Sequence, residues 1–161
     1  MNNILEVHEI DKIKTKNNAD YFLRKNFIHY VNLAGMNRNH LTSINFDNIP
    51  TKNNQNINEK IIINEVKDSI DIVDPAKKAV SAIYRTMDNC TSTPQNPFRT
   101  ILLDIYVQNK TISQIAMKTN LSESTIGNKR KIALCEFAER FEFWKKEFNG
   151  TYLPTLIVYE D

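Results

Sequence analysis

The sequence predicts an all-α fold, with a helical N-terminal part, a C-terminal helix-turn-helix unit that ends in a long helix, and a short extended tail. Two observations predict it. Apolar residues recur every three or four positions along most of the chain, which is the helical period. No sustained alternation of apolar and polar residues occurs before the tail, so strands are not expected. Only three of the 161 residues are glycine, too few for a glycine-rich nucleotide-binding loop.

The composition is typical of a globular protein without a membrane segment. The chain has a net charge of +2 and is 41% hydrophobic, enough for one compact domain or two small ones. No stretch approaches the ~18 apolar residues that span a bilayer, and the first residues lack the basic-then-apolar order of a signal peptide. Cys90 and Cys135 are isolated, without metal-ligand spacing, so we expect reduced thiols. We therefore expect a cytoplasmic protein that makes no contact with a membrane.

The first segment, residues 1–35, is predicted to be helical. Asp11 and Thr15 can each start a helix, because both residue types favour N-caps. From residue 19 onward the apolar positions have helical spacing, and Gly35 follows them as the expected residue past a helix C-terminus. The apolar positions are Ala19, Phe22, Leu23, Phe27, Tyr30, Val31 and Ala34.

The middle of the chain divides into a linker and a second helical segment. Residues 36–58 are rich in Asn, Thr, Ser and Lys and contain Pro50, so we expect a linker or long loop. Residues 59–90 are expected to be helical and are a candidate dimerisation element, with Asp74 as an N-cap and Pro75 at the first helical position. Residues 89–97 hold two prolines and several turn formers, and we place the main domain division there.

Residues 98–148 have the pattern of a helix-turn-helix. A first helix begins at Phe98, and Thr111 or Ser113 is placed to cap a short second helix. Asn120 lies where the chain must turn, and asparagine tolerates the left-handed conformation. Ser122 then caps a third helix. The spacing of Ile115, Ala116, Leu121, Ser122, Ile126, Ala133 and Leu134 resembles that of the fourth conserved region of bacterial sigma factors.

A helical wheel separates two faces on the third helix. With Ile126 taken as the inward direction, Ala133, Leu134, Phe137, Phe141 and Trp144 fall on the same side. The opposite side is polar and basic, suited to the edges of DNA bases: asparagine pairs with adenine, a threonine methyl contacts thymine, and lysine binds guanine or phosphate. The candidate DNA-binding residues, including those at the start of the second helix, are Lys110, Thr111, Ser113, Ser122, Ser124, Thr125, Asn128, Lys129 and Lys131.

Three residues depart from this pattern. Arg130 projects into the apolar sector, so it must reach around the helix edge or pair with an acid, for which Asp104 is the candidate. Gly127 costs about 1 kcal/mol relative to alanine inside a helix; close approach of the backbone to DNA explains it, and so does chance drift. Phe143 falls outside the inward sector, which predicts a second buried side, either a dimer seam or a contact with the N-terminal helices.

The chain resembles the ArpU/RinA family of phage late transcriptional regulators. The resemblance lies in SESTIGNKRKIALCEFAERF, with Ala133, Leu134, Phe137 and Ala138 matching the family's AL..FA segment, in the terminal LPTLIVYED of the 149–161 tail, and in DKIKTKNNADYFLRKNF near the start. It implies a DNA-binding activator of late packaging, structural or lysis genes, encoded by a prophage or related mobile element in a low-GC Gram-positive host, and we expect it at the nucleoid. Asn120, where such motifs prefer glycine, and Gly127-Asn128 are departures that affect the expected target sequence.

Two other functions stay open from the residues alone. One is a sigma-like subunit that needs RNA polymerase core to recognise DNA, and the other, ranked lower, is a small terminase-type packaging subunit. An enzyme is not expected, because His8, His29 and His40 are scattered without a metal-binding or catalytic pattern. We expect double-stranded promoter DNA, RNA polymerase and a second copy of the chain as partners, and no cofactor or metal.

Overall fold

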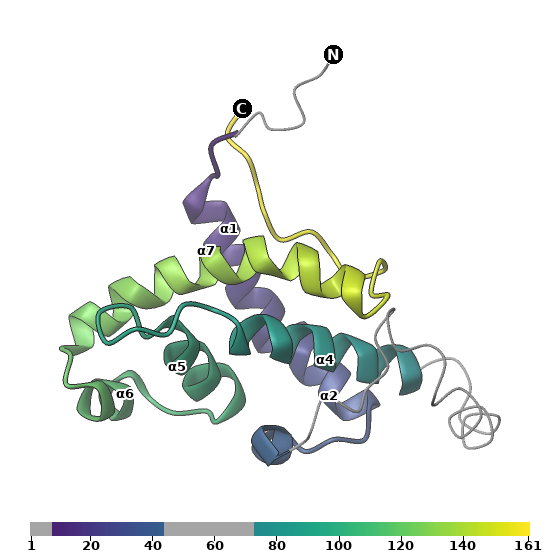
Figure 1. The fold of residues 1–161 in the computed structure, drawn as a ribbon, viewed down its shortest axis with the longest axis horizontal. Coiled ribbons are helices and arrows are strands. Elements are labelled where there is room, and N and C mark those ends of the chain that lie inside the picture. Colours follow the sequence, from purple (N-terminus) through teal and green to yellow (C-terminus); the bar gives the residue numbers. More distant parts are fainter. Residues whose placement is uncertain (1–7, 44–72) are drawn as a thin grey trace.

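The computed structural model describes residues 8–43 and 73–161, and in these the fold is all-α, as predicted (Figure 1). The described residues contain no β-strand, only isolated antiparallel bridges at Ile10–Tyr159 and Ser92–Pro97. The elements are α1 (Lys12–Tyr21), a π-helical turn (Phe22–Asn26), α2 (Phe27–Leu33), a 3-10 helix (Arg38–Ser43), α4 (Val73–Asp88), α5 (Phe98–Leu102), a second π-helical turn (Leu103–Val107), α6 (Ile112–Thr119) and α7 (Glu123–Glu147).

The N-terminal helix begins earlier than its apolar pattern indicates. The Asp11 side chain accepts a hydrogen bond from the backbone N–H of Lys14 at 2.9 Å, so Asp11 is the N-cap and α1 starts at Lys12. Its first turns are almost entirely polar, which is why the apolar pattern starts only at Ala19. Gly35, with φ of 68°, follows the helical run in the left-handed conformation, as expected.

Two expectations for the middle of the chain need correction. The predicted linker 36–58 includes the 3-10 helix Arg38–Ser43, and the rest of that linker lies outside the described residues. The first part of the helical segment expected from residue 59, as far as residue 72, also lies outside the described residues. α4 begins at Val73, which places Asp74 and Pro75 inside its first turn rather than at the cap. There the Asp74 carboxylate pairs with Lys78 one turn later, at 3.4 Å.

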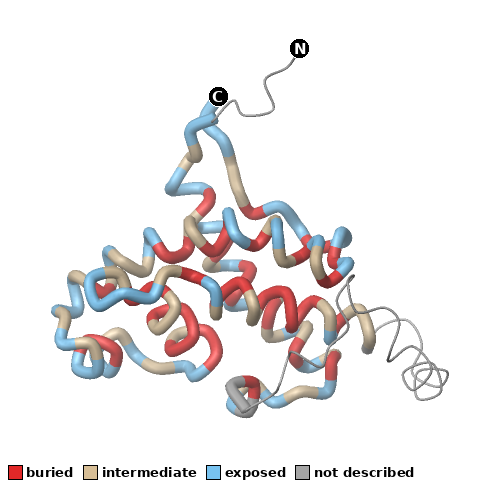
Figure 2. Tube along the Cα trace, viewed as in Figure 1, coloured by how far each residue is buried: buried red, intermediate tan, exposed pale blue. Residues whose placement is uncertain are grey.

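The core joins the two halves of the chain. α7 crosses the molecule and packs against α1, α4 and α5 (Figures 1 and 2). Phe27 and Ile83, before residues 89–97, and Leu102 and Phe137, after them, are all fully buried in one hydrophobic cluster. The segment 89–97 therefore connects two helices of a single core, and the domain division expected there is wrong.

The predicted inward face of α7 is confirmed. Ile126, Ala133, Leu134, Phe137 and Phe141 are at most 1% exposed, and Trp144 is half-buried. Phe143 is 58% exposed and contacts Trp144 edge-on, so the N-terminal helices do not cover it.

The C-terminal tail is extended and pairs with the start of the chain. Backbone hydrogen bonds of 2.8 Å join Asp11 to Val158 and Glu160 to Glu9, and the buried Thr15 hydroxyl accepts from the Val158 N–H at 2.9 Å. Lys145, only 6% exposed, donates to the Pro154 carbonyl, which holds the first part of the tail against α7. The tail thus binds its own chain at α1.

Candidate nucleic-acid interface

α6 and α7 are joined by a short turn, and the caps of the two helices include those that the sequence predicts. Thr111 and Gln114 form a reciprocal capping box at the start of α6, with hydrogen bonds of 3.2 and 2.9 Å. Asn120 ends α6 in the left-handed conformation, with φ of 56° and ψ of 31°. Ser122 accepts a hydrogen bond from the Thr125 N–H at 3.1 Å and so caps α7. Ser113 is exposed in the first turn of α6 and caps nothing.

A small hydrophobic cluster fixes α6 against the first third of α7. Ile101, Ile115, Ala116 and Ile126 are its buried members, and Ile105, Ile112 and Leu121 pack around them. This cluster is separate from the main core, although α5 and α7 contribute to both. The contact with α6 covers one side of the N-terminal third of α7, and the side that carries Ser124 and Asn128 is open.

The open side carries the predicted polar residues. Ser124, Asn128 and Lys131 are exposed and follow each other at helical spacing, so they share one face of α7. Thr125 is half-buried, and its hydroxyl lies 2.8 Å from that of Ser122. We call Ser124, Asn128 and Lys131 the reading face.

Two of the predicted lysines are engaged within the molecule. Lys110 pairs at 3.5 Å with the buried carboxylate of Asp104, which also binds Lys118 at 2.9 Å. Lys129 donates to the side chain of Asn96 at 2.9 Å, which directs it toward the 89–97 segment. These two lysines are therefore not part of the reading face, and any phosphate that they bind competes with an intramolecular partner.

Arg130 has a different partner from the one expected. It binds Asp20 of α1 at 2.5 Å, not Asp104, and its Nε donates to the Tyr106 hydroxyl at 3.2 Å. Tyr106 in turn donates to Asp20 at 2.5 Å, and Arg24 binds the same carboxylate oxygen at 2.9 Å. Burial alone would raise the pKa of Asp20, but the hydrogen bonds from Tyr106 and Arg130 and the nearby positive charges lower it. Burial and the bond to Asp20 raise the pKa of Tyr106, so it stays protonated.

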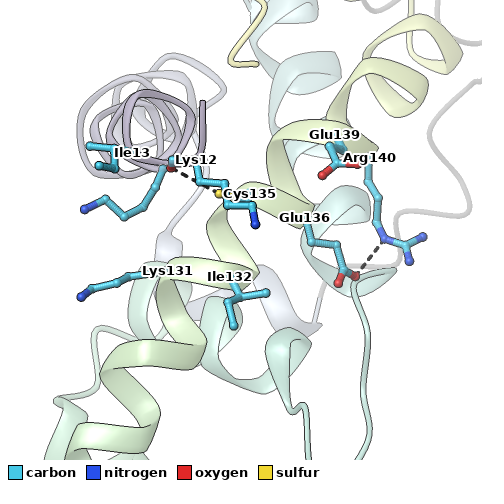
Figure 3. A pocket seen from close by; sticks show the side chains of 9 residues that line it. Lys12, Ile13, Lys131, Ile132, Cys135, Glu136, Glu139 and Arg140 are labelled. Carbon is cyan, nitrogen blue, oxygen red and sulfur yellow. Dashed lines mark hydrogen bonds and ion pairs between the residues drawn. The ribbon is translucent and has the colours of Figure 1, made fainter. Parts of the chain in front are cut away.

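A groove of 870 Å³ lies between α1 and α7, next to the reading face (Figure 3). Lys12, Ile13 and Lys16 line it from α1, and α7 contributes Lys131, Ile132, Cys135, Glu136, Glu139 and Arg140. The Cys135 thiol donates to the Lys12 carbonyl at 3.5 Å, which places the start of α1 directly beside α7.

The α1 lysines and the Asp20 network are parts of this region that the sequence did not indicate. Arg130 alone gave a signal, since a charged residue in an apolar sector requires a partner. Nothing in the local pattern of residues 12–16 relates them to α7, because that contact joins positions more than 100 residues apart.

No family model, no curated protein and no solved structure matches the chain. In residues 8–43 and 73–161, no helix combines the length and apolar content needed to cross a bilayer.

Proposed function

We propose that this protein is a sequence-specific transcription regulator that binds double-stranded DNA through the N-terminal third of α7. The observation that carries the proposal is the reading face, an exposed row of Ser124, Asn128 and Lys131 on a helix whose opposite side is locked to α6. An α-helix fits the major groove, and short polar and basic side chains are those that contact base edges there.

The distribution of partners supports the same role. Thr111, Gln114 and Ser122 are used for helix caps, and Arg130 is used to hold α7 to α1. In contrast, Asn128 and Lys131 have no hydrogen-bond or ion-pair partner among the residues that the structure describes. Asn128 offers the donor and acceptor pair that matches adenine, and Lys131 a cation for guanine or phosphate.

The finer role follows the family that the sequence resembles. We propose an activator of late genes of a prophage, which acts as a dimer in the cytoplasm of its bacterial host and contacts RNA polymerase at the promoter. Phe143 is an exposed apolar side chain on α7 that a second copy would cover.

The direct test removes the two free groups of the reading face. A cognate duplex is first selected with the wild-type protein from a randomised pool, and its affinity is measured by fluorescence anisotropy. Asn128→Ala together with Lys131→Ala is expected to weaken cognate binding at least tenfold, about 1.4 kcal/mol or more, because each base contact contributes about 1–3 kcal/mol. The melting temperature is expected to stay unchanged, since both residues are exposed.

The matched control is Asn32→Ala with Lys25→Ala, which removes the same residue types from exposed positions around α2. It is expected to leave cognate binding within twofold of wild type. A wild-type protein that enriches no sequence, or an N128A/K131A variant that binds as tightly as wild type, contradicts the proposal.

A second prediction concerns Gly127, which lies between Ser124 and Asn128 of the reading face in the sequence. A Cβ built at Gly127 meets no heavy atom within 4 Å, so the fold itself does not require glycine there. Gly127→Ala is therefore expected to raise the free energy of unfolding by about 1 kcal/mol and, at the same time, to weaken cognate binding. Thermal melting and anisotropy measure the two effects, and a stabilised variant with full affinity would show that the helix backbone does not approach DNA closely.

A further inference from the structure

The reading face continues without interruption into the groove between α1 and α7. Lys131 belongs to both, and Cys135 follows it one turn later along the same side of the helix. Cys135 is seven residues from Asn128, or about 10 Å along the helix axis. At that point the first turn of α1 contacts α7 through the Cys135–Lys12 hydrogen bond.

The α1 side of this junction is basic. Lys12 is exposed, Lys16 is half-exposed, and both line the groove with Lys131. Figure 3 shows Lys12 and Lys131 on the two facing helices. Among the residues that the structure describes, none of these three lysines has an ion-pair partner, unlike the neighbouring Lys14, which pairs with Asp11 at 3.3 Å.

The acidic residues of the groove do not neutralise this end of it. Glu136 is bound by Arg140 at 2.9 Å and by the backbone and hydroxyl of Thr91, so its charge is already compensated. Glu139 is the remaining acid, against Lys12, Lys16 and Lys131. The groove therefore has a net positive end beside the reading face and a paired end at Glu136–Arg140.

Resting on the function proposed above, we infer that Lys12 and Lys16 form a second contact with DNA, one that binds backbone phosphates at the edge of the major groove that α7 enters. The B-DNA major groove is about 12 Å wide, comparable with the ~10 Å that separates Asn128 from the α1 junction. A duplex bound at the reading face therefore places the phosphates that border the DNA major groove next to Lys12 and Lys16.

The chemistry of this contact differs from that of the reading face. Lysine ammonium groups on flexible stems bind phosphate as point charges and carry no sequence information. Ile13 and Ile132 line the same groove as the lysines and are exposed. The α1 lysines therefore position the duplex and raise its affinity, and the reading face selects the sequence.

The test measures the salt dependence of binding to a short mixed-sequence duplex, between about 50 and 200 mM potassium chloride. Each phosphate neutralised contributes about 0.9 to the slope of log K against log salt concentration. Lys12→Gln with Lys16→Gln is expected to reduce that slope by about 2 and to weaken cognate and mixed-sequence duplexes by the same factor. Lys12→Arg with Lys16→Arg is expected to restore the wild-type slope.

Lys25→Gln with Lys77→Gln is the matched control, since it removes two exposed charges away from the groove. This control is expected to leave the slope unchanged. A slope reduced as much in the control as in K12Q/K16Q would show that only net charge matters and would overturn the inference. A wild-type protein that binds no duplex defeats the proposed function itself. A wild-type protein that binds, with an unchanged slope in K12Q/K16Q, overturns only the contact at α1.

Discussion

Replacing Phe137 with alanine is expected to lower the free energy of unfolding by about 4 kcal/mol. Phe137 is fully buried on the inward side of α7 and stacks on Phe141, with ring centroids 5.4 Å apart. Phe141 in turn contacts Phe22 of the first π-helical turn at 5.2 Å. Removing the first ring therefore leaves a cavity at the place where α7 meets the N-terminal helices.

The measurement is urea unfolding followed by circular dichroism, with thermal melting as a second reading. For a chain of this size, 4 kcal/mol corresponds to a fall in melting temperature of roughly 10 °C. Phe143→Ala is the matched control, because it removes the same side chain from the same helix at a position that is 58% exposed. It is expected to change the free energy of unfolding by less than about 0.5 kcal/mol. Equal losses in the two variants would mean that Phe137 is not part of the core.

Replacing Asp20 with asparagine is expected to lower the free energy of unfolding by about 2 kcal/mol. Asp20 joins three elements, since it accepts hydrogen bonds from Arg24 on the first π-helical turn, from Tyr106 on the second and from Arg130 on α7. The variant keeps the shape of the side chain and removes its charge. Arg130, whose side chain is only 26% exposed, then loses its charged partner.

The contribution of Asp20 to the free energy of unfolding is expected to depend on pH. Because the pKa of Asp20 is lowered in the folded protein, its contribution is fully present above the ordinary aspartate value of about 4. That contribution is lost as the pH falls through the lower folded value. The difference in stability between wild type and D20N is therefore expected to be largest near neutral pH and to shrink in acid. A difference that is the same at pH 7 and pH 3 would contradict the charge-based explanation.

Two further variants separate this network from a surface ion pair. Asp74→Asn breaks a pair within one helix, with Lys78, and is expected to cost less than about 0.5 kcal/mol. Arg130→Met together with D20N completes a double-mutant cycle, in which the double variant is expected to lose less than the sum of the single ones. Additive losses would mean that Asp20 and Arg130 act independently.

The sequence predicted the parts of the fold that depend on neighbouring residues. The inward face of α7, the cap at Ser122 and the left-handed Asn120 follow from helical spacing and the preferences of single residue types, and the structure confirms all three. The start of α1 at Asp11 was one of two that the sequence offered, and apolar spacing could not choose between Asp11 and Thr15 because the first turns bury almost no apolar side chain. Thr15 is buried because the tail covers it, which no local pattern reveals.

The parts that could not be predicted join distant segments. The partner of Arg130 lies 110 positions away in the sequence, so spacing along α7 shows only that a partner is needed. The Asp104 carboxylate, predicted for Arg130, instead pairs with Lys110 and Lys118 around α6. The single core across residues 89–97 is also a long-range property, because prolines and turn formers mark the end of a helix and not the end of a core.

The continuity of α7 has a consequence for the thermodynamics of any ligand that binds its N-terminal third. Short isolated helices are marginal in water because nucleation is unfavourable, so a recognition element that folds on binding loses conformational entropy at that moment. Here the later turns of the same 25-residue helix are buried in the core, and the first turn is capped by Ser122. The ordering of Asn128 and Lys131 is thus completed when the protein folds, and backbone order contributes little to the entropy change of association.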